Sequence, residues 1–385
     1  MKVLLVVPDT NIGGITSSVV NFTNELVCRG NEVFLLDMSG ENLCSDKTDS
    51  RAHIISLKGK SKLWDIGMQT ASQEKGIKKI GILLLGLIKK ITIKSGLWYN
   101  LIFSPLKEYG EFDVAVAFRQ CAPCYSFVLS SIKAKKKIGF VHGELKYMGD
   151  ISSWQKYMSK FDKIAYVSNA VKTGFVKEIP YLEKNACVIY NMLNFEKIRE
   201  MACQSNPIKF DSNCFNIVTV ARITKQKQID WIVKICADIK KSTDKKFHWY
   251  VVGDGYYLNE VKQMAKDLCV EDVLTFTGEL SNPYPLMKYA QICVLTSRDE
   301  SFGMVVVESL ILKKPVIVAE YEALKEIISD EKYGIITPQS IDCLTEATLN
   351  MMNNENNVFF DAQNNLLNYE YSNDTPYQQF LDAVI

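Results

Sequence analysis

Two glutamates frame the segment ESFGMVVVE, residues 300–308, which is largely apolar around a central glycine. Glu300 follows a strand-like run, and Glu308 lies in a segment of helical pattern. On a helix the eight-residue step would separate them by about 12 Å along the axis. Carboxylates so placed accept hydrogen bonds from vicinal hydroxyls, so one can hold a sugar and the other a ribose. Between them a helix is expected to start. Its first backbone amides can donate hydrogen bonds to phosphate oxygens, and they are those of Ser301, Phe302, Gly303 and Met304.

Two cations occur earlier, in VTVARITKQKQID. Arg222 comes directly after a strand-like run and Lys227 follows five residues later. Cations at this spacing can neutralise a diphosphate, both when it binds and while it gains charge as a leaving group. The alternative is a pair of solvated surface charges, which is the commoner fate of Arg and Lys.

Glycines mark other strand ends. Gly13 and Gly14 precede a helical segment, Gly253 lies in VVGDG, and Gly278 with Glu279 lies in TFTGEL, where the chain would border a planar ligand such as a nucleobase. Glycine allows close backbone approach, and a helix start attracts anions; plain tight turns are the alternative. The pattern matches neither G-x-G-x-x-G nor G-x-x-x-x-G-K-[ST], which disfavours a Rossmann dehydrogenase or a P-loop NTPase.

These residues need a scaffold of short apolar strands that alternate with helical segments. One such series begins at Lys2, and a second begins near Asn216 after a polar stretch. Near-continuous apolar strands predict parallel sheets covered on both faces, whose ligands lie beyond the carboxyl ends of the strands. The sequence therefore predicts an α/β protein with two doubly wound, Rossmann-like domains facing each other across a cleft, covering residues 1–200 and 201–368.

Composition narrows the function classes. The 45 Lys plus Arg residues balance 44 Asp plus Glu, so nucleic acid is not an expected partner. The eleven cysteines form no disulfide framework, and the single Cys-x-x-Cys, Cys121 and Cys124, is interpreted as a pair of ordinary buried thiols rather than a zinc site. The apolar run before Pro8 and Asp9 is shorter than the h-region of a signal peptide, and no apolar run reaches the ~20 residues that span a bilayer, so we expect a cytoplasmic protein.

In this order, the glycine pair, the Arg-x4-Lys pair, VVGDG, TFTGEL and ESFGMVVVESLILKKPVIVAE resemble the retaining glycosyltransferases of family 4, which have the GT-B fold. The resemblance covers essentially the whole chain. It implies a terminal helix, within residues 369–385, that packs back on the first domain. It also implies transfer of a sugar from a nucleotide-diphospho-sugar, with UDP as the expected nucleotide, to a saccharide acceptor with retention of configuration.

The resemblance also assigns roles. It makes Arg222 and Lys227 the diphosphate clamp, Glu300 the ligand of the donor sugar and Glu308 the ligand of the ribose. Gly14 would lie beside the diphosphate, and His142, in GFVHGE, would approach the ring hydroxyls of the sugar. A packed histidine bonded to the backbone is the alternative for His142.

The sequence departs from the family pattern at three places. Ala221 and Gln228 replace glycines that usually flank the two cations, and Tyr321 begins a loop where small residues are usual. The chain has no Asp-x-Asp, so we expect no metal cofactor, with Arg222 and Lys227 carrying that electrostatic role.

A basic amphipathic segment, residues 58–94, holds nine lysines against two acidic residues. One helical face would carry apolar residues from Ile77 to Ile91, flanked by Lys78, Lys79, Lys89 and Lys90. Such a helix can lie in an anionic membrane interface, which predicts a peripheral protein on the inner face of the cell membrane with a lipid-linked acceptor. The alternative is that the apolar stripe packs on the core of the first domain.

Two other functions remain open at this point. One is a non-catalytic scaffold that binds nucleotide-sugars, and the other is a sugar-nucleotide epimerase on the same fold. Donor hydrolysis would separate the scaffold from an enzyme, and an acceptor-free product assay would identify the epimerase.

Overall fold

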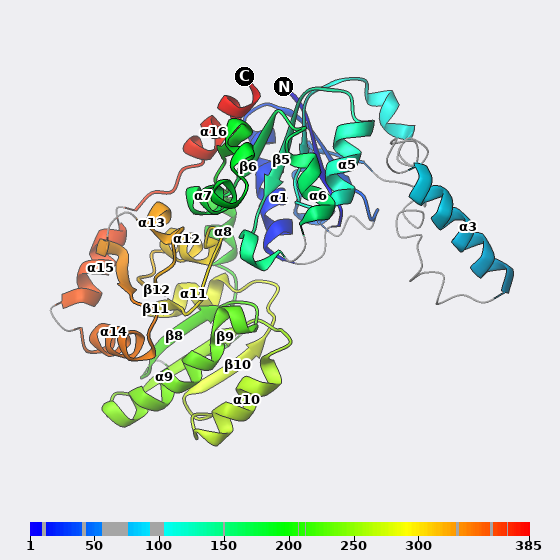
Figure 1. Ribbon diagram of the computed structural model, residues 1–385. Helices are drawn as coiled ribbons and strands as arrows, with labels where there is room; N and C mark the ends of the chain where they lie inside the picture. Colours follow the sequence, from blue (N-terminus) through cyan, green and yellow to red (C-terminus); the bar gives the residue numbers. More distant parts are fainter. Residues whose placement is uncertain are drawn as a thin grey trace. The chain divides into compact units, whose positions relative to one another are not determined.

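The computed structural model describes residues 1–9, 13–40, 44–55, 76–92, 104–148, 151–206, 208–211, 213–328, 331–354, 357–367 and 369–385. The chain divides into two compact units. Unit 1 comprises Met1–Leu193 together with Asn373–Ile385, and unit 2 comprises Asn194–Ser372. Each unit contains one sheet with helices around it (Figure 1).

Unit 1 is built on a seven-stranded sheet of order β3-β2-β1-β4-β5-β6-β7, in which neighbouring strands pair in parallel. The apolar runs seen in the sequence form its central strands, and Val3, Leu4 and Leu5 of β1 are fully buried. The strands are β1 (Lys2–Val7), β2 (Glu32–Asp37), β3 (His53–Ile55), β4 (Phe112–Ala117), β5 (Ala134–Val141), β6 (Lys163–Tyr166) and β7 (Ala186–Val188).

The core of unit 1 is rich in aromatic rings. Phe22 of α1 lies 5.3 Å from Phe118, 5.5 Å from Phe140 and 5.4 Å from Phe380 between ring centroids, and all four rings are buried. The α-helices are α1 (Gly14–Cys28), α3 (Gly76–Thr92), α5 (Ala122–Ser131), α6 (Ser152–Met158), α7 (Asn169–Glu178) and α16 (Asp374–Val384). The 3₁₀ helices are η1 (Ser45–Lys47), η4 (Ser104–Tyr109), η5 (Leu145–Tyr147) and η6 (Pro180–Asn185).

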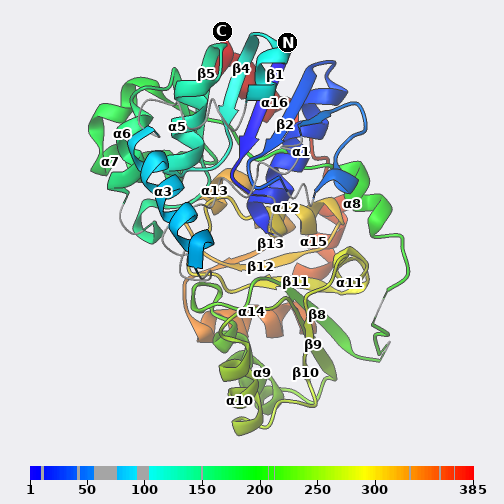
Figure 2. The same ribbon diagram turned by 90° about the vertical axis from the view of Figure 1, so that its right-hand side faces the viewer.

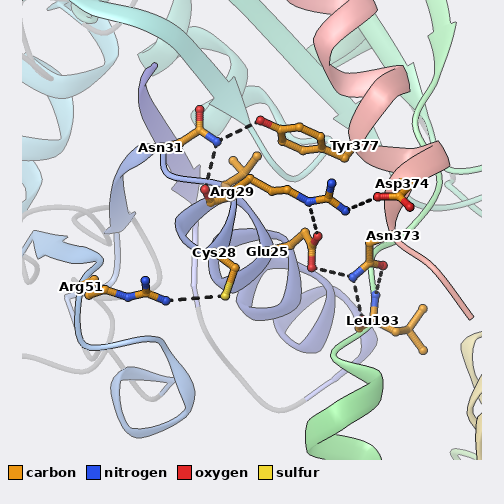
Figure 3. A network of polar contacts seen from close by, with 10 residues as sticks. Glu25, Cys28, Arg29, Asn31, Arg51, Leu193, Asn373, Asp374 and Tyr377 are labelled. Carbon is orange, nitrogen blue, oxygen red and sulfur yellow. Dashed lines mark hydrogen bonds and ion pairs between the residues drawn. The ribbon is translucent and has the colours of Figure 1, made fainter.

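The C-terminal helix α16 is part of unit 1 although it comes last in the chain. Figure 3 shows the polar contacts at its start: the Asn373 side chain donates to Glu25 at 2.7 Å and accepts from the Leu193 amide at 3.1 Å. Arg29 pairs with Asp374 at 2.6 Å. With Phe380 buried against Phe22, these contacts attach the helix to α1.

Unit 2 is built on a six-stranded parallel sheet of order β10-β9-β8-β11-β12-β13. Its strands are β8 (Phe215–Val220), β9 (Phe247–Val252), β10 (Leu274–Gly278), β11 (Ile292–Leu295), β12 (Val316–Ala319) and β13 (Gly334–Thr337). The fold class predicted from the alternation of strands and helices is thereby confirmed for both units.

Helices of unit 2 cover its sheet. One buried core joins the strands to α9, α10, α14 and α15, and α9 and α10 lie beside the strands β8 to β10 in Figure 2. The α-helices are α8 (Phe195–Met201), α9 (Ile229–Ser242), α10 (Leu258–Asp267), α11 (Tyr284–Tyr289), α12 (Met304–Ile311), α13 (Leu324–Ile327), α14 (Ile341–Asn353) and α15 (Val358–Leu367), with the 3₁₀ helices η7 (Lys225–Lys227) and η8 (Glu331–Tyr333).

The unit boundaries differ from those expected at 200/201 and 368/369. They lie at 193/194 and 372/373. Helix α8 belongs to unit 2 because it is capped by Asn194 and packs against α11 and α12. Tyr369 also belongs there, since its ring lies 5.2 Å from that of Tyr333 and its carbonyl accepts from Lys313.

Candidate functional site

The candidate residues of unit 2 gather at the carboxyl edge of its sheet. Arg222 lies two residues beyond β8, Gly253 directly follows β9, and Gly278 ends β10, with Glu279 next. Glu300 lies in the loop that connects β11 to α12. Because parallel strands end on the same edge, residues spread over some 80 positions share one side of the sheet, where such folds bind ligands.

Lys227 and Glu300 form an ion pair. Lys227 ends the turn η7, both side chains are largely buried (13% and 19% exposed), and Ser297 Oγ donates to Glu300 Oε1 at 2.9 Å. The sequence suggested a role for each residue but not that they would bind each other, nor the part of Ser297. An ammonium group has three N–H donors, so Lys227 can hold Glu300 and still donate to a phosphate.

Glu308 has a different environment on α12. Tyr284, in α11, donates its hydroxyl to Glu308 Oε1 at 3.2 Å. Burial raises the pKa of Glu308 to about 7, although the Tyr284 hydrogen bond acts in the opposite direction. The carboxyl therefore takes up a proton more readily than an exposed glutamate does. No feature of the sequence identified Tyr284 as its partner.

The start of α12 is shaped by Gly303 and Tyr321. Gly303 is the N-cap residue, has a left-handed φ of 89°, and offers no side chain to cap the helix. A Cβ at this position would lie 2.1 Å from Tyr321 Oη, so the glycine permits that close approach. Phe302 is buried and Ser301 half-buried beside it. The buried Tyr321 hydroxyl has no hydrogen-bond partner among the described residues.

Gly253 is required by packing. A Cβ there would lie 2.0 Å from the carbonyl oxygen of Ala221, and φ is 141°. Its amide donates to the carbonyl of Gly278 at 2.9 Å, which joins the ends of β9 and β10. The turn beside Arg222 therefore depends on glycine for a structural reason, independent of any ligand contact.

In unit 1, Gly13 and Gly14 begin α1 directly after the part of the β1–α1 loop, residues 10–12, that lies outside the described residues. A Cβ at either glycine would meet no atom within 4 Å. Packing among the described residues therefore does not require glycine here, and the space beside both residues is open.

His142 directly follows β5 in unit 1. Its main-chain amide donates to Gln120 Oε1 at 3.1 Å, and its ring is hydrogen-bonded to the backbone of Phe118 and lies 4.9 Å from the Phe118 ring. Burial lowers the pKa of His142 to about 4, so the imidazole is neutral at neutral pH. Nε2 has no partner among the described residues. Since the other nitrogen holds the proton that bonds Phe118, Nε2 is a hydrogen-bond acceptor.

Helix α3 occupies part of the basic amphipathic segment. Among its described apolar side chains Ile82 is half-buried and the others are exposed: Ile80 (60%), Leu83 (43%), Leu84 (56%), Leu85 (37%), Leu87 (55%), Ile88 (46%) and Ile91 (68%). The alternative of a stripe packed on the core is therefore wrong for these residues. Lys78 and Lys90 are exposed, whereas residues 58–75 and 93–94 and the side chains of Ile77, Lys79 and Lys89 lie outside the description. Within the described chain no helix is long and apolar enough to cross a bilayer.

Residues 204–371 match the family model of "Glycosyl transferases group 1". The chain is 32% identical over 122 residues to alpha-monoglucosyldiacylglycerol synthase of Streptococcus pneumoniae, covering 31% of this chain and 27% of that protein. It is 25% identical over 178 residues to N-acetylgalactosamine-N,N'-diacetylbacillosaminyl-diphospho-undecaprenol 4-alpha-N-acetylgalactosaminyltransferase of Campylobacter jejuni, covering 46% of this chain and 47% of that one. Among these curated relatives the chain spans less than two thirds of each protein's length.

Two solved structures resemble the chain over its full length. TarM of S. aureus, crystallised with UDP and alpha-GlcNAc-glycerol, aligns with a TM-score of 0.69 at 15% identity and 100% coverage of both chains. HepE of Anabaena, in complex with UDP and glucose, aligns at 0.68 with 17% identity, covering 100% of this chain and 99% of that one. The protein has the two-domain α/β fold of GT-B glycosyltransferases, and its second unit matches the group 1 family.

Proposed function

We propose that the protein is a retaining hexosyltransferase that moves a sugar from a UDP-linked donor to a lipid-linked saccharide in the assembly of a bacterial surface polysaccharide or glycolipid. The observation that carries this proposal is the buried Lys227–Glu300 pair at the carboxyl edge of unit 2, within the part of the chain that matches the group 1 family. The UDP donor is supported by similar folds crystallised with UDP. The lipid acceptor is supported by relatives whose names include a diacylglycerol and a diphospho-undecaprenol.

In this proposal Glu308 accepts hydrogen bonds from the ribose, and Glu300 accepts from hydroxyls of the transferred sugar. Lys227, Arg222 and the first amides of α12 stabilise the diphosphate as it leaves. His142 Nε2 accepts from a ring hydroxyl of the sugar. No residue is assigned as a nucleophile, and the leaving diphosphate itself helps to deprotonate the acceptor on the same face.

The electrostatic role of Lys227 and Arg222 makes a metal ion unnecessary in this scheme. Transfer should therefore persist in excess EDTA. Activity that is abolished by the chelator and restored by Mg²⁺ or Mn²⁺ would contradict this part of the proposal.

The test of the function is a transfer assay with a panel of probes. UDP-glucose, UDP-galactose, UDP-N-acetylglucosamine and UDP-N-acetylgalactosamine are each incubated with vesicles that contain diacylglycerol, a glycosyl-diacylglycerol or a polyprenyl-diphosphate-linked saccharide. We expect one donor to release UDP and yield a product whose anomeric configuration by NMR is that of the donor. Binding of UDP-sugars without hydrolysis or transfer would favour the scaffold, and an epimerised donor in the absence of acceptor would favour the epimerase.

Helix α3 is the proposed site of membrane attachment, because its exposed leucines and isoleucines present an apolar face beside exposed lysines. Each lysine near an anionic surface contributes about 1 kcal/mol before screening. Sedimentation with anionic vesicles should be strong, should fall with salt, and should drop when Lys78, Lys79, Lys89 and Lys90 become Glu. Four Lys→Glu changes at the exposed Lys241, Lys246, Lys262 and Lys266 of unit 2 are the matched control. Equal binding by both variants would leave a soluble acceptor as the better hypothesis.

A further inference from the structure

Cys121 and Cys124 lie at the start of α5, with Ala122 and Pro123 between them, and residues 118–120 separate Cys121 from the end of β4. Cys121 is the N-cap residue and is partly exposed, whereas Cys124 is fully buried in the first turn. A Cys-x-x-Cys pair placed in this way, with its first cysteine at a helix start and its second in the first turn, can become reactive. The sequence had suggested only two ordinary buried thiols.

The two thiols differ chemically because of where they lie. The neighbouring Cys124 side chain, the Cys124 amide and the charge of Arg119 lower the pKa of Cys121, while burial acts in the opposite direction. Burial raises the pKa of Cys124 well above its usual range. The Cys124 thiol donates its hydrogen to the carbonyl oxygen of Val6 at 3.3 Å. Cys121 therefore ionises more readily than Cys124, and the buried Cys124 remains a thiol until a partner sulfur is beside it.

The residues just before Cys121 hold His142 in place. The Phe118 backbone bonds the imidazole, and the Gln120 side chain accepts from the His142 amide. Arg119, between them, pairs with Asp9 at 2.7 Å. Cys121 directly follows residues 118–120. A disulfide between Cys121 and Cys124 can therefore shift this segment and the hydrogen bonds through which it orients His142.

We propose that Cys121 and Cys124 form a redox-active dithiol that closes to an intramolecular disulfide by exchange with low-molecular-weight disulfides. The Cys121 thiolate attacks one sulfur of the small disulfide and releases one small thiolate. The Cys124 thiolate then attacks the Cys121 sulfur of the mixed disulfide and releases the second. Two protein thiols and one small disulfide thus become one protein disulfide and two small thiols. The effect of this protein disulfide on sugar transfer, which would act through His142, rests on the function proposed above.

The test exposes the full-length protein to mixtures of reduced and oxidised glutathione and maps disulfides by mass spectrometry. We expect wild-type protein to form the Cys121–Cys124 bond. The control variant, in which the exposed Cys28, Cys203 and Cys269 become Ser, should form it at the same glutathione ratio. Cys124→Ser should accumulate one glutathione on Cys121, because the resolving thiol is gone. Cys121→Ser should leave Cys124 unmodified, because that sulfur is buried.

The wild-type mapping needs no variant to fold, so it decides the central claim. The proposal would be overturned if no Cys121–Cys124 bond formed in oxidised glutathione without reduced glutathione. It would also be overturned if Cys124 in Cys121→Ser were glutathionylated as much as Cys121 in Cys124→Ser. Oxidation should also lower sugar transfer at least several-fold in wild type, reversibly with dithiothreitol, and leave Cys121→Ser unchanged. A disulfide that forms without changing transfer would overturn the link to His142. Absence of transfer under all conditions would instead count against the proposed function, while the mapping would still stand.

Discussion

The two units hold their candidate residues by different means. In unit 2, side chains hold one another: Lys227 pairs with Glu300, and Tyr284 bonds Glu308. In unit 1, His142 is held by the Phe118 backbone and by the Gln120 side chain on its own amide. A charged pair can be dismantled by one substitution, whereas a backbone anchor survives most side-chain changes. The contrast predicts that unit 2 is the more sensitive half.

Each unit also contains one candidate residue whose pKa is shifted by burial, with opposite consequences for charge. Burial lowers the pKa of His142 to about 4 and raises that of Glu308 to about 7. Both groups are thereby moved toward the neutral form, as expected for groups removed from water. Lowering the pH should therefore destabilise unit 1, and raising the pH should destabilise unit 2.

The largest effect is expected for Lys227→Ala. Removing the ammonium leaves the largely buried Glu300 carboxylate without its cation and removes a donor to the leaving diphosphate. Transfer, measured as kcat/KM, should fall roughly 100- to 1,000-fold. Lys225→Ala is the matched control, because Lys225 lies in the same turn, is exposed, and contacts the Tyr257 ring. Similar kinetics for the two variants would remove Lys227 from the site.

The next effect is the acid sensitivity of unit 1. Because the unfolded chain binds a proton at His142 between pH 6.5 and about 4 and the folded chain does not, stability is present above pH 6.5 and is lost as pH falls through this window. The loss is at most roughly 3 kcal/mol. Hydrogen exchange followed by mass spectrometry resolves unit 1 from unit 2. The loss should shrink in His142→Gln and persist in His53→Gln, whose exposed ring lies on β3; equal losses would contradict the buried neutral imidazole.

The position of the candidate residues at the sheet edge could be predicted from the sequence, but their side-chain partners could not. Arg222 and Glu300 could be placed on one edge because parallel strands end together, and the alternation of strands and helices was enough for that. The partners could not be predicted, because Lys227 and Glu300 are separated by 73 positions and Tyr284 and Glu308 by 24. Spacing along the chain does not report how side chains from different loops meet. The exposed face of α3 was equally ambiguous, since the same periodicity describes a packed helix.

Glu308 should give the opposite pH response in unit 2. The folded chain binds a proton there between pH 4.5 and about 7 and the unfolded chain does not, so its contribution is fully present below pH 4.5 and is lost as pH rises through 7. UDP affinity should rise over the same range, because the carboxylate accepts stronger hydrogen bonds from the ribose hydroxyls than the protonated carboxyl does. Glu308→Gln should flatten both trends and weaken UDP binding by about 1.5–3 kcal/mol in calorimetry.

Tyr284→Phe sharpens this test. Without the hydroxyl that favours the carboxylate, the pKa of Glu308 should rise further, and the pH dependence of UDP affinity should move to higher pH. For Glu308→Gln the matched control is Glu260→Gln, at an exposed position in α10. A Tyr284→Phe profile that coincides with wild type would show that Tyr284 does not set the charge of Glu308.

The smallest effect concerns the turn that presents Lys227. Gln228, where the family pattern has glycine, adopts a left-handed conformation with φ 49° and ψ 43° between η7 and α9. Its amide oxygen is buried without a partner among the described residues. A non-glycine residue in the left-handed conformation costs roughly 1–2 kcal/mol, which glycine would relieve. Glycine also makes the unfolded chain more flexible, and this offsets part of the gain. Gln228→Gly should therefore raise the free energy of unfolding of unit 2 by roughly 0.5–1 kcal/mol.

Asn354→Gly is the matched comparison, because Asn354 has φ 52° but its side chain accepts from the amides of Phe359 and Phe360 at 3.1 and 3.2 Å. Glycine there relieves the same backbone strain and removes two hydrogen bonds, so Asn354→Gly should destabilise unit 2. Because the Lys227–Glu300 pair, rather than the backbone of Gln228, fixes the ammonium, kcat for Gln228→Gly should stay within about twofold of wild type, which is about 0.4 kcal/mol. A stabilised Gln228→Gly whose kcat drops as far as that of Lys227→Ala would show that backbone strain positions the lysine, and unit 2 would then resemble unit 1.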